Sequence, residues 1–269
     1  MIRFDRIGPS VSKLARATDV PFRFGRYIER GFEIFSKAPG GMVGVAAVYV
    51  GASFVIALLN SIFPLPGLQI VLSAAIYPIL SGLTIQAYYA STRGRASFER
   101  GFDFTPYFGR LMGLAFVDVA ITVIVFVGVF LGGLLLGFAG DFTNVIESGT
   151  SSIGLVYGII GILLVALLLA SLVRCLFYFS THFVMFYNMD VMESLKASYR
   201  LTVQHYWGVL GLSVLSVVIG VLGMLACYVG VLAAYPVIYA IGYAAFEYLA
   251  LFDKNENESD DVIQHLLDL

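Results

Sequence analysis

Charged residues are scarce in this chain, and their scarcity excludes an ordinary soluble domain. Only 13% of the 269 residues are charged and 59% are hydrophobic, whereas soluble domains are about a quarter charged and about half apolar. The mean hydropathy is +0.88. Several apolar runs reach the roughly 18 residues that cross a bilayer as a helix. The sequence therefore predicts an all-α, polytopic membrane protein.

Cysteine and histidine are also rare. Cys175 and Cys227 fall toward opposite membrane faces, which is too far apart for a disulfide, and we expect both to pack as small apolar side chains. His182, His205 and His265 have no partner at metal-ligand spacing on a shared helix face. We therefore expect no metal site and no bound cofactor.

Motifs of known catalytic sites are missing as well. The chain has no Gly-Xaa-Ser-Xaa-Gly elbow, no Walker loop and no dinucleotide-binding fingerprint. Convergent acid, base and nucleophile groups are not visible either. We expect a protein that is not an enzyme and that has no nucleic-acid partner.

Six apolar runs define the predicted transmembrane domain, residues 21–252. A cytoplasmic segment, 1–20, precedes it and an acidic cytoplasmic tail, 253–269, follows it. Proline and glycine in FPLPG at 63–67 break the helix and permit a tight hairpin. The predicted spans are 42–62, 67–90, 109–139, 152–179, 208–227 and 230–252.

Basic residues mark one membrane face. All sixteen Lys and Arg residues lie before the first span, around the connections from the second to the third and from the fourth to the fifth span, or after the sixth. The three opposite loops contain none, and the longest carries only Asp141 and Glu147. By the positive-inside rule, both termini are expected in the cytoplasm.

A repeated phrase precedes the first and third spans. RGFEIFSKAPGGM, residues 30–42, returns as RGFDFTPYFGRLM at 100–112, and DVMESLKASYRLTVQHYW at 190–207 takes the same place before the fifth span. Polar and apolar residues alternate at helical spacing, so we expect three amphipathic elbow helices in the interface. The internal repeat is then elbow, span, turn and span. The expected lipid-headgroup contacts, which could instead only fix topology, are Arg23, Arg26, Arg30, Lys37, Lys196 and Arg200.

Two opposite charges fall inside predicted spans. Asp118 lies eight residues beyond Arg110, about 12 Å into the third span, and Arg174 lies at a comparable depth in the fourth. Charges in hydrocarbon are costly and usually pair or mark a pathway. We expect Asp118 and Arg174 to form an ion pair, which serves either structure or a proton or substrate relay.

Glycines and prolines punctuate the spans. Pro78 and Pro236 each follow a tyrosine, and ordinary kinks are expected there, although broken helices of the kind found in transporters are the alternative. Small-xxx-small spacing predicts close packing of the second hairpin, or else dimerisation. The glycines at this spacing are Gly128, Gly132, Gly133, Gly137, Gly154 and Gly158.

The last unit carries a family resemblance. FYNMDVMESLKASYRLTVQHYWGVLGL, followed after a tight turn by AAYPVIYAIGYAAFEYL, resembles the closing unit of bacterial multi-pass inner-membrane proteins. These are related to the membrane domain of glycerophosphoryl diester phosphodiesterases. The similarity is clearest over about residues 185–250 and weaker over 24–110. It implies an inner-membrane location, but not the phosphodiesterase activity, because that family's soluble barrel has no counterpart here.

Together these patterns predict an integral inner-membrane protein with a non-enzymatic accessory, assembly or envelope-maintenance role. Its cytoplasmic surface is expected to contact membrane lipids or a membrane-protein complex. The alternative is a transporter of a small solute or lipid that uses Asp118, Arg174 and the two Tyr-Pro sites.

Overall fold

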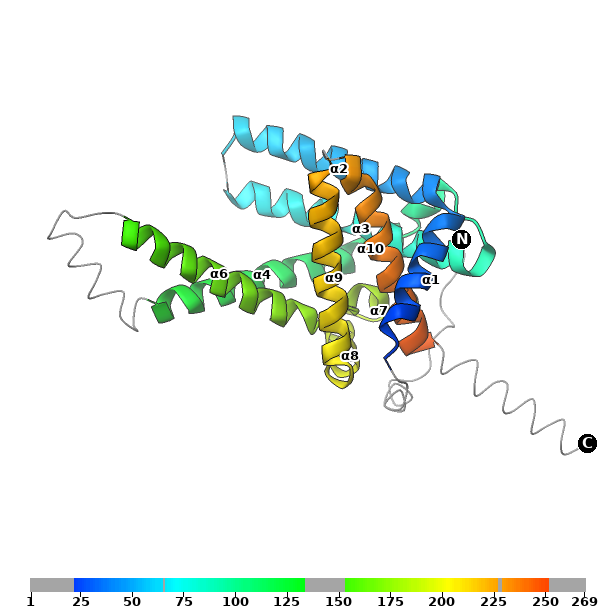
Figure 1. Ribbon diagram of the computed structural model, residues 1–269. Helices are drawn as coiled ribbons and strands as arrows, with labels where there is room; N and C mark the ends of the chain where they lie inside the picture. Colours follow the sequence, from blue (N-terminus) through cyan, green and yellow to red (C-terminus); the bar gives the residue numbers. More distant parts are fainter. Residues whose placement is uncertain (1–21, 65, 134–152, 227–228, 252–269) are drawn as a thin grey trace, which may run out of the picture.

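The computed structural model describes residues 22–64, 66–133, 153–226 and 229–251. Within these ranges the regular structure is entirely helical, and six helices are long and apolar enough to cross a membrane (Figure 1). The predicted all-α, multi-pass fold is confirmed. The predicted terminal segments, 1–20 and 253–269, lie outside the described residues, as does Cys227.

The six long helices are joined in pairs, and a shorter element precedes each pair. The long helices are α2 (Pro39–Ile62), α3 (Pro66–Arg93), α4 (Phe108–Gly133), α6 (Ile153–Cys175), α9 (Tyr206–Leu225) and α10 (Val229–Phe246). The elements before the pairs are α1 (Phe24–Lys37), the 3₁₀ turns η2 (Phe98–Phe102) and η3 (Thr105–Tyr107), and α8 (Val191–Gln204). Two elements extend the pairs: α7 (Ser180–Tyr187) after α6, and the π-helical turn η5 (Glu247–Leu251) after α10.

The three hairpins close into a ring. The partners within each hairpin pack together: α2 with α3, α4 with α6, and α9 with α10. The second helix of each hairpin also contacts the first helix of the next, so α3 meets α4, α6 meets α9, and α10 returns to α2. The hairpins are not parallel, because α9 and α10 stand upright in Figure 1 while α2, α3 and α4 run across them.

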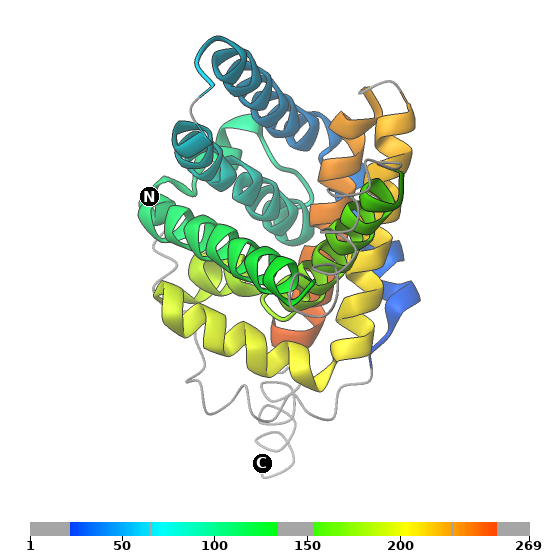
Figure 2. The same ribbon diagram turned by 90° about the vertical axis from the view of Figure 1, so that its left-hand side faces the viewer.

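The elements before the hairpins are here called the elbows. Like the hairpins, each elbow packs against the unit that precedes it in the ring. α1 packs on α10, η2 packs on α3, and α8 packs on α7. Each elbow therefore lies against the last part of the preceding hairpin. Figure 2 shows α8 lying across the lower end of the molecule before the chain turns up into α9.

The second elbow differs from the expected helix. Residues 98–107 form the two short turns η2 and η3, with Pro106 inside the second. Proline has no N–H to donate, and it disfavours the α conformation at the preceding residue. A continuous α-helix is therefore interrupted here, whereas α1 and α8 have no internal proline.

Close backbone contacts at glycine account for the phrase that is repeated at residues 30–42 and 100–112. A Cβ on Gly31 would lie 2.7 Å from the Ile241 Cα of α10. A Cβ on Gly82 of α3 would collide with the carbonyl oxygen of Gly101. The arginine of each phrase pairs with the acid three residues later: Arg30 with Glu33 at 2.7 Å and Arg100 with Asp103 at 3.5 Å. The phrase thus combines a close backbone contact with a local ion pair.

The third elbow uses small residues and hydroxyls for the same purpose. Ser194, Ala197, Ser198 and Thr202 are buried on the inner face of α8. The Ser198 hydroxyl accepts a hydrogen bond from the Phe179 N–H at 3.1 Å and donates to the Leu176 carbonyl at 3.3 Å. These bonds tie α8 to the turn between α6 and α7.

Aromatic side chains pack together in the core that the three hairpins enclose. Tyr88 of α3, Phe186 of α7 and Tyr243 of α10 contact one another with centroid distances of 5.5, 5.7 and 6.4 Å. His182 is buried, with its ring 4.9 Å from that of Phe246. The reason is that the chain re-enters the core as α7 after α6 ends, and Asn188 ends α7 in the left-handed conformation (φ 53°).

We predict that Gly31→Ala lowers the free energy of unfolding by about 1–3 kcal/mol, because the added methyl group must displace the backbone of α10. Gly25→Ala, on the same helix, is the matched control, since a Cβ there meets no described atom within 4 Å. It should be neutral or stabilising by up to about 1 kcal/mol. Thermal unfolding in detergent would measure both, and equal midpoints would contradict the proposed contact.

Candidate functional site

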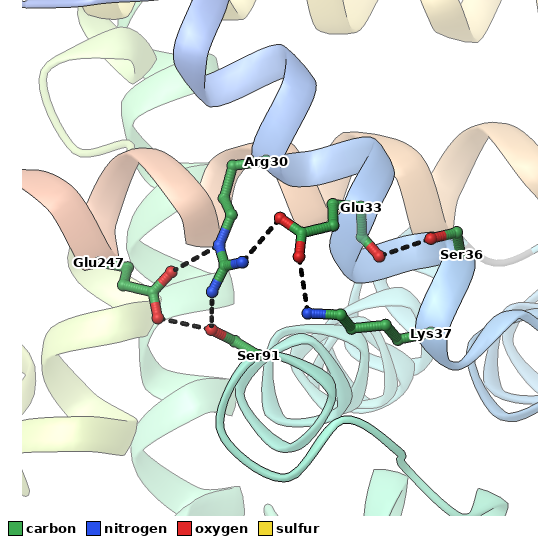
Figure 3. Close-up of polar contacts among 6 residues, drawn as sticks. All are labelled: Arg30, Glu33, Ser36, Lys37, Ser91 and Glu247. Atoms are coloured by element: carbon green, nitrogen blue, oxygen red, sulfur yellow. Dashed lines mark hydrogen bonds and ion pairs between the residues drawn. The ribbon is translucent and has the colours of Figure 1, made fainter.

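A polar cluster forms where α1, α3 and η5 meet (Figure 3). Arg30 donates from Nη1 to Glu33 at 2.7 Å and from Nη2 to the Ser91 hydroxyl at 3.0 Å, and its Nε lies 3.6 Å from Glu247. Ser91 donates to the second Glu247 oxygen at 2.6 Å, and Lys37 donates to Glu33 at 2.7 Å. Two cations and two carboxylates therefore balance one another.

This cluster changes the interpretation of two predicted lipid contacts. Arg30 and Lys37 are both engaged by carboxylates of the same chain, so neither is a free cation, and their contact with lipid stays a prediction. The cluster instead connects α1 to α3 and η5, three elements that are distant in the sequence.

The other four predicted contacts have a different environment. Arg23, Arg26, Lys196 and Arg200 are exposed, and none forms an ion pair within the described part of the chain. On α8 the two cations stand beside exposed apolar groups. We call this outward face, with the first residues of α9, the α8 rim. Its residues are Met192, Lys196, Tyr199, Arg200, Val203 and Trp207.

The α8 rim mixes side chains that the sequence assigned to opposite stripes. An amphipathic α8 would place Tyr199 and Val203 on the face opposite Lys196 and Arg200, yet all four are exposed. The reason is the packing face of α8, where small residues allow close approach to neighbouring helices, as is common in membranes. The large side chains, apolar and basic alike, therefore point away from the protein.

Asp118 and Arg174 are brought together. Arg174 Nη2 donates to Asp118 Oδ2 at 2.6 Å, between α4 and α6. The pair is not sealed in the core, since the Asp118 side chain is 33% exposed and that of Arg174 is 51% exposed. The geometry agrees with the matched depths in the sequence, while a relay role stays a prediction.

The two prolines lie within continuous helices. Pro78 is inside α3 and Pro236 inside α10, and both are buried. Each leaves the carbonyl four residues earlier without its usual helical donor. The preceding tyrosines have polar or aromatic neighbours: Tyr77 Oη lies 3.5 Å from Thr181 Oγ1, and the Tyr235 ring lies 5.5 Å from that of Tyr49.

The predicted glycine contacts divide into three groups. Gly133 faces α6, because a Cβ there would lie 2.8 Å from Ile162 Cδ1. Gly128 and Gly132 do not pack within the hairpin, since a Cβ at either meets no described atom within 4 Å. They lie on other faces of α4 than the one that meets α6. Gly137 lies outside the described residues, and the structure describes no side-chain surroundings for Gly154 and Gly158.

Sequence reasoning singled out neither Ser91 nor Glu247 for this cluster. A periodic signal was present. Ser91 ends a series of hydroxyl residues at helical spacing on α3, and Glu247 ends a similar series on α10. Which residues face each other across the two helices could not be obtained from that spacing.

Six long apolar helices in three hairpins, with charges confined to a few clusters, define a multi-pass helical membrane protein. The chain belongs to the family described as a domain of unknown function (DUF7847), whose profile matches residues 25–254. No curated protein and no solved structure matches the chain significantly. The family match covers all three hairpins.

We predict that Asp118→Asn and Arg174→Gln are coupled by about 1–3 kcal/mol in a double-mutant cycle, because each single change leaves a charge unpaired between apolar helices. The matched pair is Arg100→Gln with Asp103→Asn, which has nearly the same exposure but joins residues only three positions apart in one elbow, with expected coupling below about 1 kcal/mol. Denaturant titration in micelles would measure both cycles. Equal coupling energies in the two cycles would contradict the expectation that breaking the Asp118–Arg174 pair costs more than breaking the Arg100–Asp103 pair.

Hydrogen bonds from Lys37 and then from Arg30 lower the pKa of Glu33 from its ordinary 4.5 to about 2. A lowered carboxyl pKa stabilises the folded state above about pH 4.5, and this contribution is lost as the pH falls toward 2. We predict that Lys37→Gln raises the pKa of Glu33. Carbon-13 titration of labelled glutamate carboxyl groups would measure it, with Glu33→Gln to assign the signal. An unchanged pKa would contradict the contact.

Proposed function

We propose that this protein is a non-enzymatic accessory or envelope-maintenance component of the bacterial inner membrane, which binds anionic lipid headgroups along the α8 rim. One observation carries the proposal: Lys196 and Arg200 are exposed on α8, as are Tyr199 on the same helix and Trp207 at the start of α9, and the two cations have no ion pair among the described residues. A lipid phosphate supplies the missing negative charge.

The chemistry of the rim fits a membrane surface. Tryptophan and tyrosine favour the headgroup level of a bilayer, where one part of the ring is apolar and another is wet. Trp207 is 81% exposed. Each basic side chain near an anionic leaflet contributes about 1 kcal/mol of attraction. Arg23 and Arg26 of α1, exposed beside Phe24, would add to the same interaction.

The orientation is part of the proposal. The basic residues on one side and their absence from the opposite loops support a cytoplasmic position for the rim and for both termini. The packing of α1 along α10 also supports a common face for the two ends, since the Tyr27 and Tyr248 rings lie 5.4 Å apart. A relationship with phosphodiesterase membrane domains rests on the motif at 185–250.

Transport of a small solute or lipid is the second candidate. The Asp118–Arg174 pair favours it, because a charge pair among apolar helices is often found on a substrate or ion pathway. Flux into proteoliposomes, compared with the Asp118→Asn variant, would test this role. A membrane-protein partner would instead be found at fixed stoichiometry after mild detergent extraction.

The single tryptophan of the chain allows a direct test of lipid binding. In nanodiscs, brominated phosphatidylglycerol should quench Trp207 fluorescence more than brominated phosphatidylcholine. Lys196→Gln with Arg200→Gln should weaken the preference by about 2 kcal/mol, or roughly 30-fold in relative affinity.

The matched control removes two cations that already have acidic partners. Lys37→Gln with Arg110→Gln changes the net charge equally, but Lys37 pairs with Glu33 at 2.7 Å and Arg110 with Asp190 at 3.1 Å. This variant should keep the preference for phosphatidylglycerol. Equal quenching by the two lipids in the unaltered protein would reject the proposal, and an equal loss in both variants would reduce it to a net-charge effect.

A further inference from the structure

Hydroxyl side chains follow one face of α3. They recur at intervals of four, three, four and three residues, which places them on a single helical face. From first to last they span 91 − 77 = 14 positions, about 21 Å at 1.5 Å per residue. This is a large part of a hydrocarbon core of about 30 Å. The residues are Tyr77, Ser81, Thr84, Tyr88 and Ser91.

A second polar series faces the first. Residues at every fourth position of α10 and the start of η5 are polar: Tyr235, Tyr239, Tyr243 and Glu247. α3 and α10 pack together. The Tyr88 and Tyr243 ring centroids lie 6.4 Å apart, and the Ser91 hydroxyl donates to Glu247 at 2.6 Å. We call the contact between the two series the α3–α10 seam.

Polar contacts lie at both ends of the seam. At the elbow end, Glu247 belongs to the cluster with Arg30. At the other end, Tyr77 Oη of α3 lies 3.5 Å from Thr181 Oγ1 of α7, and α7 packs against α4, the helix that carries Asp118. The seam therefore extends from the Arg30–Glu247 cluster toward the helix that carries Asp118.

Three buried side-chain oxygens of the seam lack a hydrogen-bond partner among the described residues, those of Ser81, Thr84 and Tyr243. Ser81 and Thr84 are 1% and 0% exposed. Other hydroxyls on the same or neighbouring helices bond back to their own backbone, as Thr92 does to Tyr88 and Thr122 to Asp118, at 2.8 and 2.9 Å. A buried hydroxyl without a partner is costly, and bound water is the usual partner when protein supplies none.

We propose that the α3–α10 seam holds a file of water molecules that links Glu247 to the Asp118–Arg174 pair. Serine, threonine and tyrosine hydroxyls can each donate and accept, so the file can be hydrogen-bonded along its length. Asp118 then exchanges protons with the aqueous phase on the elbow side, although it lies between the apolar helices α4 and α6. This hydration goes beyond lipid binding and does not depend on it.

Cysteine accessibility tests the water file. With Cys175→Ala and Cys227→Ala removing the native thiols, Ser81→Cys and Thr84→Cys are treated with silver ions in sealed vesicles. Free thiols are then counted with a fluorescent maleimide after denaturation. Both cysteines should be blocked by silver, because the thiolate forms only in contact with water. Leu83→Cys is the matched control, since Leu83 is equally buried on another face of α3.

Each outcome decides the proposal. Blocking at positions 81 and 84 but not at 83 supports a hydrated seam. No blocking at 81 and 84 overturns it, and equal blocking at all three positions overturns it too, because hydration would then not follow the hydroxyl face.

A stability measurement gives an independent answer. Thr84→Val removes the hydroxyl at nearly constant shape, so a dry, unpaired hydroxyl would make the variant as stable as the unaltered protein or more so. If water bonds the hydroxyl, Thr84→Val should lower the thermal midpoint at least as much as Thr92→Val, which removes a hydroxyl that bonds Tyr88. A raised midpoint for Thr84→Val would overturn the proposal.

Discussion

Close backbone contact at glycine is the constraint on which the ring of hairpins depends. In a bilayer, lipid tails compete equally for apolar side chains, so helices associate through close packing and polar contacts more than through the hydrophobic effect. Gly31 against Ile241, and Gly82 against Gly101, bring two elbows onto the second helices of neighbouring hairpins. Ser198 plays the corresponding part in the third elbow. Without these approaches the elbows could not lie against the last helices of the preceding hairpins.

The three elbows occupy equivalent places in the fold, but their charged side chains have different partners. The first uses Arg30 and Lys37 within the protein, in contact with Glu33 and Glu247. The second is short and aromatic, and Arg100 pairs locally with Asp103. The third exposes its two cations beside large apolar side chains. Arg30, Lys37 and Arg100 are therefore engaged within the chain, whereas Lys196 and Arg200 point away from it.

Polar groups inside the helices are concentrated in few places. The hydroxyl series of α3 and α10 begins at the Arg30–Glu247 cluster and runs toward α7, which packs against the helix that carries Asp118. Burying polar groups in hydrocarbon costs free energy. Because these groups are aligned in one seam, water or a partner charge can offset that cost. The remainder of the helix surface, including α4 around Ile124 and α6 around Leu164, is apolar and exposed, as lipid contact requires.

The sequence alone was sufficient for the six spans, the hairpin order and the meeting of Asp118 with Arg174. Hydropathy and the position of a residue along its helix are local properties, and both can be obtained from a short stretch of sequence. The tertiary structure decided which cations are free, which glycines pack and which hydroxyls face each other. Arg30 meets Ser91 across 61 positions, and Ser91 meets Glu247 across 156. Such contacts depend on how the hairpins close around one another, and the rotation of each helix in a ring is set by all of its neighbours together.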